Sequence, residues 1–460
     1  MMATVTNIPG FGGELIMPTD DAYDRKRAVW NGMVDRRPAA ILRCLSTEDV
    51  VAAVRFARES QLEIAVRCGG HSVLGLSVPN GGVMIDLSPI SEVRVDPVAR
   101  KAWVGGGSLL RNLDVAAQEH GLATTAGNVS HTGVGGLTLG GGMGWLARQV
   151  GLACDNLEAC TVVTAEGRVV RASESENPDL FWGLRGGGGN FGIVTEFEFR
   201  LHPVVGRALI ADFVFDAANG PDAMRGWRDL LPDAPRAATL TASATTVGGV
   251  PVVNVGCVWV GDMAEGRRYL STFRELGTPA TERVREMSYV ELQSISDDPN
   301  SHGVRRYSKG HYLTALSNDA IDAFLARGLS GKRTDPDWAR VPNGGFQAYG
   351  GAIADFGDDD SAFSHRQTLV EFGCGTSWVD PGEDDERVSA ARAYGAALAP
   401  FANGVYVNAL GDEGQEGVRR AYPERKLARL VDLKGRYDPD NAFHLNQNIR
   451  PAAREAPNPR

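Results

Sequence analysis

Three glycine-dense segments in the first 200 residues constrain this chain more than any other feature of its sequence. They span residues 67–72, 127–142 and 185–192, and the first places His71 directly after a Gly-Gly pair. Glycine lacks a Cβ and tolerates positive φ, so such segments let the backbone approach a ligand closely. Their exposed N–H groups can then bind an anion. Each segment alone is typical of a tight turn, but the three together predict a cradle for a large phosphate-bearing ligand.

Length and charge exclude several classes of protein. A chain of 460 residues exceeds what one hydrophobic core usually supports, so we expect two or three domains. The 47 Lys and Arg against 57 Asp and Glu give a net charge of −10, which argues against a nucleic-acid partner. No stretch of about 18 apolar residues is present, so no membrane span is expected. The N-terminus shows no secretory signal.

The cysteines indicate a reducing compartment. They are scattered and have no metal-ligand spacing, so we expect buried free thiols, a cytoplasmic protein and no metal. These cysteines are Cys44, Cys68, Cys154, Cys160, Cys257 and Cys374.

Hydrophobic patterning predicts a mixed succession of helices and strands. Ser46 is a candidate N-cap for a helix at 46–60, and a second helix is expected at 109–120. The predicted strands are 64–66, 83–87, 193–201 and 252–260, with hairpins joining 92–96 to 101–104 and 161–164 to 168–171. Glycine density falls after about residue 205, and 207–404 is typical of a separate α+β domain.

The spacing of Gly187, Gly189 and Gly192 matches a dinucleotide-binding fingerprint. That fingerprint requires a strand before it and a helix after it. Here a predicted strand follows it, so we reject a Rossmann site and disfavour an NAD-dependent enzyme. No P-loop sequence is present either.

The glycine segments belong to a longer series of motifs. Together the motifs resemble the flavin oxidases of the vanillyl-alcohol-oxidase fold, in the branch of berberine-bridge-type and hydroxynicotine oxidases. The matching segments are 66–72, 133–142, 151–157, 177–192, 406–408, 438–443 and 446–449. The middle of the chain matches only in outline.

This resemblance implies an α+β fold with an FAD-binding domain in two parts, residues 1–205 and 405–460. Residues 206–404 would form an inserted substrate domain with a large antiparallel sheet covered by helices. In such relatives the histidine that matches His71 is bonded covalently to the 8α-methyl of the flavin. The alternative is that His71 only forms a hydrogen bond in a turn.

The resemblance also implies a set of cofactor-binding positions. These are Arg67, Cys68, Gly69, Gly70, His71, Ser72, Gly127, Val129, Thr132, Gly133, Gly135, Gly136, Leu137, Gly140, Gly141, Gly144, Trp145, Asn190, Gly192, Ile193, Val194, Tyr406, Asn446 and Asn448. Many relatives have a second link, through a cysteine at the position of Val129, so we expect a single histidyl link here. Met143 replaces a tyrosine that lies over the substrate in many doubly linked relatives.

Five residues are candidates for the catalytic chemistry. Tyr406 is the leading candidate for the base, and alternation places it with Asn408 on one strand face, although the two could be a structural pair. His131 lies beside the former cysteine position, and Lys309 corresponds to a lysine near the substrate of similar enzymes; either could instead be structural or solvated. Gln347 shares a strand face with Tyr349. Some relatives have a carboxylate near Gln347, and its absence argues against a strong base on that strand.

We therefore expect an FAD oxidase with a single flavin link at His71. It would oxidise a C–O or C–N bond of a small to medium metabolite and use O2 as acceptor, releasing H2O2. Thr132 and Leu137 match an oxygen pocket of some relatives, so an oxygenase stays open, as do a dehydrogenase and a flavin-loaded binding protein without turnover. The expected partners are a small-molecule substrate and O2, without nucleic acid or membrane, and the chain would be a monomer or homodimer.

Overall fold

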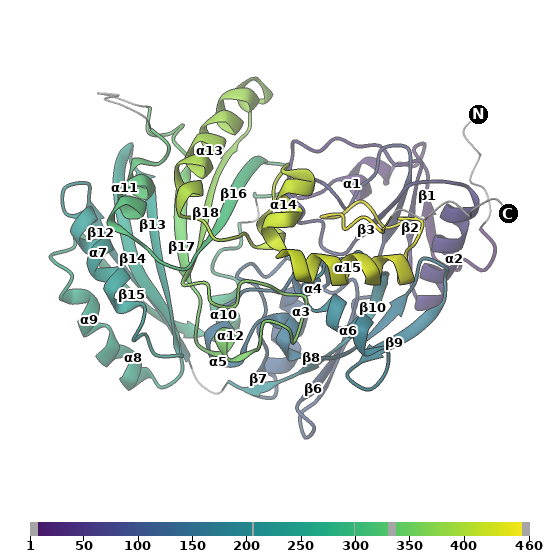
Figure 1. Ribbon diagram of the computed structural model, residues 1–460, viewed down its shortest axis with the longest axis horizontal. Coiled ribbons are helices and arrows are strands. Elements are labelled where there is room, and N and C mark those ends of the chain that lie inside the picture. The colour runs from purple at the N-terminus through teal and green to yellow at the C-terminus, as the bar shows by residue number, and fades with distance from the viewer. Residues whose placement is uncertain (1–7, 205–206, 299, 330–336, 453–460) are drawn as a thin grey trace.

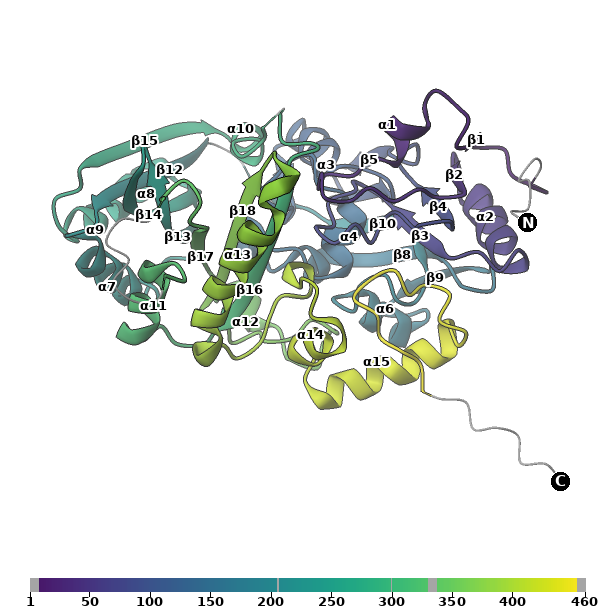
Figure 2. The same ribbon diagram turned by 90° about the horizontal axis from the view of Figure 1, so that it is seen from above.

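The computed structural model describes residues 8–204, 207–298, 300–329 and 337–452. The fold is α+β, as predicted. Sheets of four and five strands lie toward one end of the molecule, and a sheet of seven strands lies toward the other (Figure 1). Viewed from above, β16, β18 and α13 lie between the two ends (Figure 2).

The four-stranded sheet includes the predicted strands 64–66 and 83–87, and the predicted helix 46–60 connects two of its strands. Its order is β1-β2-β4-β3, with β1 antiparallel to β2 and the other neighbours parallel. The helix α2 connects β2 to β3 and begins where expected, because the Ser46 side chain accepts a hydrogen bond from the Asp49 N–H. The bounds are β1 Glu14–Ile16, α1 Tyr23–Arg27, β2 Ala40–Arg43, α2 Thr47–Glu59, β3 Ile64–Arg67 and β4 Val83–Asp86.

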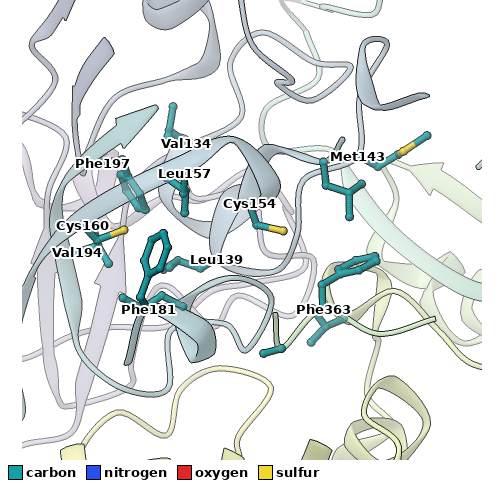
Figure 3. Packing of buried hydrophobic residues seen from close by; sticks show 14 of the residues in the cluster. Val134, Leu139, Met143, Cys154, Leu157, Cys160, Phe181, Val194, Phe197 and Phe363 are labelled. Carbon is teal, nitrogen blue, oxygen red and sulfur yellow. The ribbon is translucent and has the colours of Figure 1, made fainter. Parts of the chain in front are cut away.

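The five-stranded sheet is antiparallel throughout and has the order β5-β6-β10-β8-β9. Both predicted hairpins are confirmed, as β5–β6 and β8–β9. Figure 3 shows Phe197 and Val194 of β10 near Phe181 of α6 and Leu139 and Val134 of α4, all in one buried hydrophobic cluster. The bounds are β5 Val93–Asp96, β6 Lys101–Gly105, α3 Leu110–Gln118, α4 Val134–Leu139, β8 Leu157–Val163, β9 Val169–Ser173, α6 Pro178–Leu184 and β10 Ile193–Arg200.

The seven-stranded sheet is also antiparallel and has the order β15-β12-β14-β13-β17-β18-β16. Its strands include the predicted 252–260 segment. The bounds are β12 Arg207–Asp216, β13 Ala238–Val247, β14 Val250–Val260, β15 Thr281–Ser288, β16 Arg305–Leu313, β17 Asn343–Ala348 and β18 Val370–Trp378.

The two faces of the seven-stranded sheet have different roles. Phe346 of β17 and Phe372 of β18 belong to a buried cluster with Trp227, Phe324 and Tyr394. These three come from α7 (Gly220–Leu230), α11 (Asn318–Ala326) and α13 (Asp384–Leu398), so helices cover this face. Because side chains alternate along a strand, the neighbours of the two phenylalanines point to the opposite face, toward the glycine-rich part of the chain.

The C-terminal helices return to the glycine-rich part. The helices α14 (Gly414–Ala421) and α15 (Glu424–Tyr437) are yellow in Figure 1, and α15 packs against α6. Lys434 of α15 is fully buried, paired with Asp438 and hydrogen-bonded to the carbonyls of Asn190 and Phe443. It therefore ties the end of the chain to the third glycine segment.

The remaining elements are short connectors. None of the helices in the described ranges combines the length and the hydropathy needed to cross a membrane. The connectors are β7 Leu122–Ala123, α5 Ala147–Val150, η1 Ala153–Asn156, β11 His202–Pro203, α8 Met263–Tyr269, α9 Ser271–Arg274, α10 Tyr289–Gln293, α12 Ala352–Asp355, η2 Pro381–Glu383, η3 Ala399–Phe401 and η4 Val407–Ala409.

Candidate functional site

The first two glycine segments meet through their backbones. A Cβ at Gly69 would overlap the backbone of Gly133, and a Cβ at Gly133 would overlap that of Gly69. Only glycine at both positions permits this approach. The contact joins the turn that follows β3 to the loop that precedes α4.

A cavity of about 450 Å³ lies where the three glycine segments meet the C-terminal part of the chain. Nine of its lining residues are glycines, eight from the three segments and one, Gly106, directly after β6. Among the predicted site residues, those that line the cavity are Cys68, Gly69, Gly70, His71, Ser72, Thr132, Gly133, Gly135, Gly136, Leu137, Gly192, Ile193, Val194, Tyr406, Asn408 and Asn446.

Tyr406 and Asn408 pack onto the second glycine segment. The Tyr406 hydroxyl oxygen accepts hydrogen bonds from the Gly142 N–H at 2.8 Å and from Asn408 Nδ2 at 2.9 Å. A Cβ at Gly140 would overlap the Asn408 amide, and Gly141 has φ +131° where Tyr406 approaches. Glycine at 140 and 141 is therefore required for the contact with these two side chains.

The prediction that Tyr406 and Asn408 share a strand face is wrong. Tyr406 is extended, but Val407–Ala409 form the short 3-10 helix η4. The two side chains still meet, because the Ala409 N–H bonds to the Tyr406 carbonyl and folds the chain back. The local alternation of apolar and polar residues was too short to distinguish a strand from a turn.

His71 lies in a stack of rings at the wall of the cavity. Its imidazole stacks on Trp30, with ring centroids 4.8 Å apart and an interplanar angle of 20°. Its Nε2 shares a hydrogen bond of 2.7 Å with Nδ1 of His131. His302, which sequence reasoning did not identify, lies with its ring centroid 5.3 Å from that of His131.

Burial, which is the largest cause, and the neighbouring His131, His302 and Arg306 together lower the pKa of His71 to about 3. The guanidinium of Arg306 lies 3.8 Å from the Trp30 ring centroid, on the same stack of rings. His71 is therefore a neutral imidazole at physiological pH, with one nitrogen free to act as a nucleophile.

The sheet face above this site contains a carboxylate that sequence reasoning missed. Gln347 of β17 pairs in register with Glu371 of β18, and Glu371 pairs in register with Tyr312 of β16. These residues alternate with Phe346 and Phe372, so they lie on the face opposite the helices. The strand of Gln347 itself has no carboxylate, as the sequence indicates, but the neighbouring strand β18 provides one on the same face.

Glu371 belongs to a buried tyrosine network. Tyr349 donates a hydrogen bond of 2.7 Å to Glu371 Oε2, and the hydroxyls of Tyr349 and Tyr312 lie 3.2 Å apart. The Tyr312 ring stacks beside Tyr406, with centroids 6.4 Å apart. Burial raises the pKa of Glu371 to about 7. No cation in the described ranges forms an ion pair with Glu371, so this carboxyl is available to exchange a proton near neutral pH.

Gln347 itself forms one hydrogen bond across the site. Its Oε1 accepts a hydrogen bond of 3.0 Å from Asn128 Nδ2, in the second glycine segment. Gln347 Nε2 and Asn128 Oδ1 are buried and have no partner among the described residues. Such unsatisfied groups are costly in a folded protein unless a ligand pairs with them.

The assignment of Lys309 to the substrate site is wrong. Lys309 pairs in register with Cys374, so its side chain lies on the helix-covered face and packs against Gly395 of α13. Its ammonium pairs with Asp412 at 3.0 Å and with Glu413 at 2.9 Å. The adjacent Ser308 points the other way and lines the cavity.

The other predicted residues lie outside the cavity lining. Arg67 bonds to the carbonyl of Lys26, and the Trp145 carbonyl accepts a hydrogen bond from Thr239 of the seven-stranded sheet. Val129 accepts the Thr132 N–H through its carbonyl. Asn190 bonds to the Gly187 and Gln447 carbonyls and holds the third glycine segment against the C-terminal segment. Gly127, Gly140, Gly141 and Gly144 pack closely against other parts of the chain, and Asn448 accepts a hydrogen bond from Gln415 through its carbonyl.

The lining fits FAD. A Cβ at Gly136 or Gly189 would meet no protein atom within 4 Å, so the backbone there faces open space in the cavity. Asn446 lines the same space, and its buried Oδ1 has no partner among the described residues. The phosphates of a large ligand can bind the exposed glycine backbone. Its hydrogen-bond donors can pair with the unpaired Asn446 oxygen.

Comparison with known proteins agrees with this geometry. Residues 38–173 match the family described as FAD binding domain, and residues 405–450 match berberine and berberine-like proteins. The chain is 32% identical over 427 residues to an FAD-linked oxidoreductase of Dictyostelium discoideum, which covers 92% of this chain and 91% of that relative.

Solved structures share the fold, two oxidases among them. The 6-hydroxy-D-nicotine oxidase from Arthrobacter nicotinovorans has a TM-score of 0.86 and 27% identity, over 95% of this chain and 98% of that one. The glucooligosaccharide oxidase from Acremonium strictum, which contains a 6-S-cysteinyl, 8α-N1-histidyl FAD, has a TM-score of 0.86 and 24% identity. That second match covers 96% of this chain and 98% of the other.

Proposed function

This chain belongs to the FAD-linked oxidoreductases of the berberine-like type, and from this premise we propose that it is an oxidase with FAD attached through His71. It would oxidise a C–O or C–N bond of a small to medium metabolite and pass the electrons to O2, giving H2O2. The observation that carries the proposal is the neutral His71 imidazole in the wall of a glycine-lined cavity that fits FAD.

A single link suits the residues around the cavity. Val129 stands where the doubly linked relatives have cysteine, and a valine cannot form a thioether. Cys68 lines the cavity, but burial raises the pKa of its thiol to about 11, and its Sγ lies 3.4 Å from the Ser108 carbonyl. A protonated thiol is a poor nucleophile, so His71 is the attachment point that we propose among the residues lining the cavity.

When bound, FAD supplies the acceptor for a hydride at N5 of its isoalloxazine ring. The protein must then orient the substrate and accept the proton of its O–H or N–H group. Glu371 is the strongest candidate for this role, with Tyr349 and Tyr312 connecting it to the region of Tyr406. The unpaired amide groups of Gln347 and Asn128 would orient the polar end of the substrate.

The first test is acid denaturation of the purified protein. We expect the yellow colour to precipitate with the chain and a tryptic peptide containing His71 to be heavier by one FAD less two hydrogens. The variant His71→Ala should release its flavin into the supernatant. Colour that leaves the unmodified protein in acid would contradict the histidyl link, and absence of colour would contradict the proposed cofactor.

A second candidate function is a flavin-dependent oxygenase, because Thr132 and Leu137 both line the cavity. The two functions differ in stoichiometry: an oxidase releases one H2O2 per substrate oxidised, whereas an oxygenase places an oxygen atom in the product. A peroxide assay together with product mass in 18O2 separates them. A flavin-loaded protein without turnover is disfavoured, because Glu371 provides a carboxylate opposite Gln347.

A further inference from the structure

We propose that His131 is the positioning residue that activates His71 for covalent attachment of FAD. His131 would accept the Nε2 proton of His71 while Nδ1 of His71 forms the bond to the flavin. This inference rests on the proposed attachment at His71.

The hydrogen bond between the two histidines fixes which nitrogen of His71 is free. A neutral imidazole has one donor and one acceptor nitrogen. The Nε2 atom lies 2.7 Å from Nδ1 of His131, whereas Nδ1 of His71 has no hydrogen-bond partner among the described residues. A proton on Nδ1 would thus be an unsatisfied donor, while a proton on Nε2 is paired. The paired tautomer leaves the Nδ1 lone pair free at the cavity.

The surroundings hold the ring in this orientation. Trp30 stacks on one face of His71 and limits rotation of the imidazole. Arg306 lies over Trp30, with its guanidinium 3.8 Å from the ring centroid. Its positive charge opposes protonation of His71. His131 is only half-buried, so a proton taken up by His131 can pass directly to solvent.

The attachment reaction balances with O2 as the oxidant. One C–H bond of the 8α-methyl and one N–H bond of His71 break, and one C–N bond forms. The two electrons pass through the flavin to O2, which takes up the two protons and becomes H2O2. The N–H proton is the one on Nε2, which His131 is placed to accept; the N-substituted imidazole that results is neutral.

The test measures how fast the link forms in four variants. His131→Ala and His131→Leu remove the acceptor, His131→Asn keeps an acceptor oxygen near the position of Nδ1, and His302→Ala is a matched control that leaves the hydrogen bond intact. Each protein is purified with its FAD and incubated in air. The intact mass then reports the linked fraction over time, and flavin absorbance reports whether FAD is bound.

We expect the unmodified protein and His302→Ala to be fully linked as isolated. His131→Ala and His131→Leu should bind FAD without linking it and should then form the link about a hundredfold more slowly, which is typical for loss of a proton acceptor. His131→Asn should recover much of the rate. A purely structural role for His131 would instead reduce FAD occupancy in all three substitutions.

Two other outcomes separate a failure of this inference from a failure of the proposed attachment. Complete linking of His131→Ala at the rate of the unmodified protein would overturn this inference and leave the proposed attachment intact. An unmodified protein that releases all its flavin in acid would overturn the proposed attachment, and this inference with it.

Discussion

Glu371 is the residue whose ionisation should set the pH dependence of substrate oxidation. Burial raises its pKa from 4.5 to about 7, and only the carboxylate can accept a proton. The rate of flavin reduction should therefore rise with pH through about 7 and level off above it. In Glu371→Gln the rate should fall about a hundredfold and lose this inflection.

This prediction is measured by stopped-flow reduction of the flavin at a series of pH values, with a substrate found by peroxide screening. Glu282→Gln is the control, because Glu282 lies on β15 at the edge of the same sheet and pairs with Arg274. A Glu371→Gln variant that keeps the inflection near pH 7 would move the role of base to another group.

Tyr406 has a structural role that its substitution should reveal. Its oxygen accepts hydrogen bonds from the Gly142 N–H and from Asn408 Nδ2. Tyr406→Phe leaves the Gly142 N–H without this acceptor, whereas Asn408 Nδ2 keeps the carbonyls of Gly136 and Leu137. We expect a loss of about 1–3 kcal/mol in the free energy of unfolding, read from urea denaturation. A change below about 0.5 kcal/mol would show that other acceptors replace the hydroxyl.

At the scale of the element, side chains alternate along β16, so that one face contributes to the cavity and the other to stability. Lys309 points to α13 and pairs with Asp412 and Glu413, whereas Ser308 points into the cavity. Lys309→Met should leave the rate of flavin reduction unchanged. It should lower the free energy of unfolding by about 1–3 kcal/mol, because Asp412 and Glu413 lose their half-buried cationic partner.

Ser308→Leu is the matched variant on the same strand. It should weaken substrate or cofactor binding and leave stability nearly unchanged. If instead Lys309→Met abolished turnover and Ser308→Leu did not, the assignment of the two faces of β16 would be reversed.

At the scale of the whole molecule, the cavity depends on contacts between the two ends of the chain. We propose that residues 1–205 and 405–460 form the cofactor domain around it, with 206–404 inserted between them. Lys434 joins these two parts, because its buried ammonium bonds to Asp438 and to the carbonyls of Asn190 and Phe443.

Lys434→Met should cost about 3–5 kcal/mol in the free energy of unfolding, because it leaves Asp438 buried without its partner. It should also lower FAD occupancy, because the segment from Phe443 to Gln447 lines the cavity. Urea denaturation and the flavin-to-protein absorbance ratio measure the two effects. Arg425→Met on the same helix, where the side chain is 86% exposed, should change neither.

Local sequence was sufficient for features that depend on neighbouring residues. The helix after Ser46, both hairpins and the glycine turns follow from caps, alternation and the absence of a Cβ, which act within a few residues. The motifs, through their resemblance to a known family, also predicted the FAD-binding fold. The prediction of a strand at Tyr406–Asn408 failed because the alternation there is too short to specify a strand.

Only the tertiary structure decided which distant side chains meet. Glu371 lies opposite Gln347 because of the register between β17 and β18, and the pairing of His131 with His71 depends on the backbone contact between Gly69 and Gly133. Whether the Lys309 side chain points to the cavity or away from it depends on which face of the sheet the helices cover. The sequence by itself thus determined the cofactor cradle, because backbone freedom is a local property. The proton-accepting groups required the fold, because register and packing are set by contacts between residues far apart in the chain.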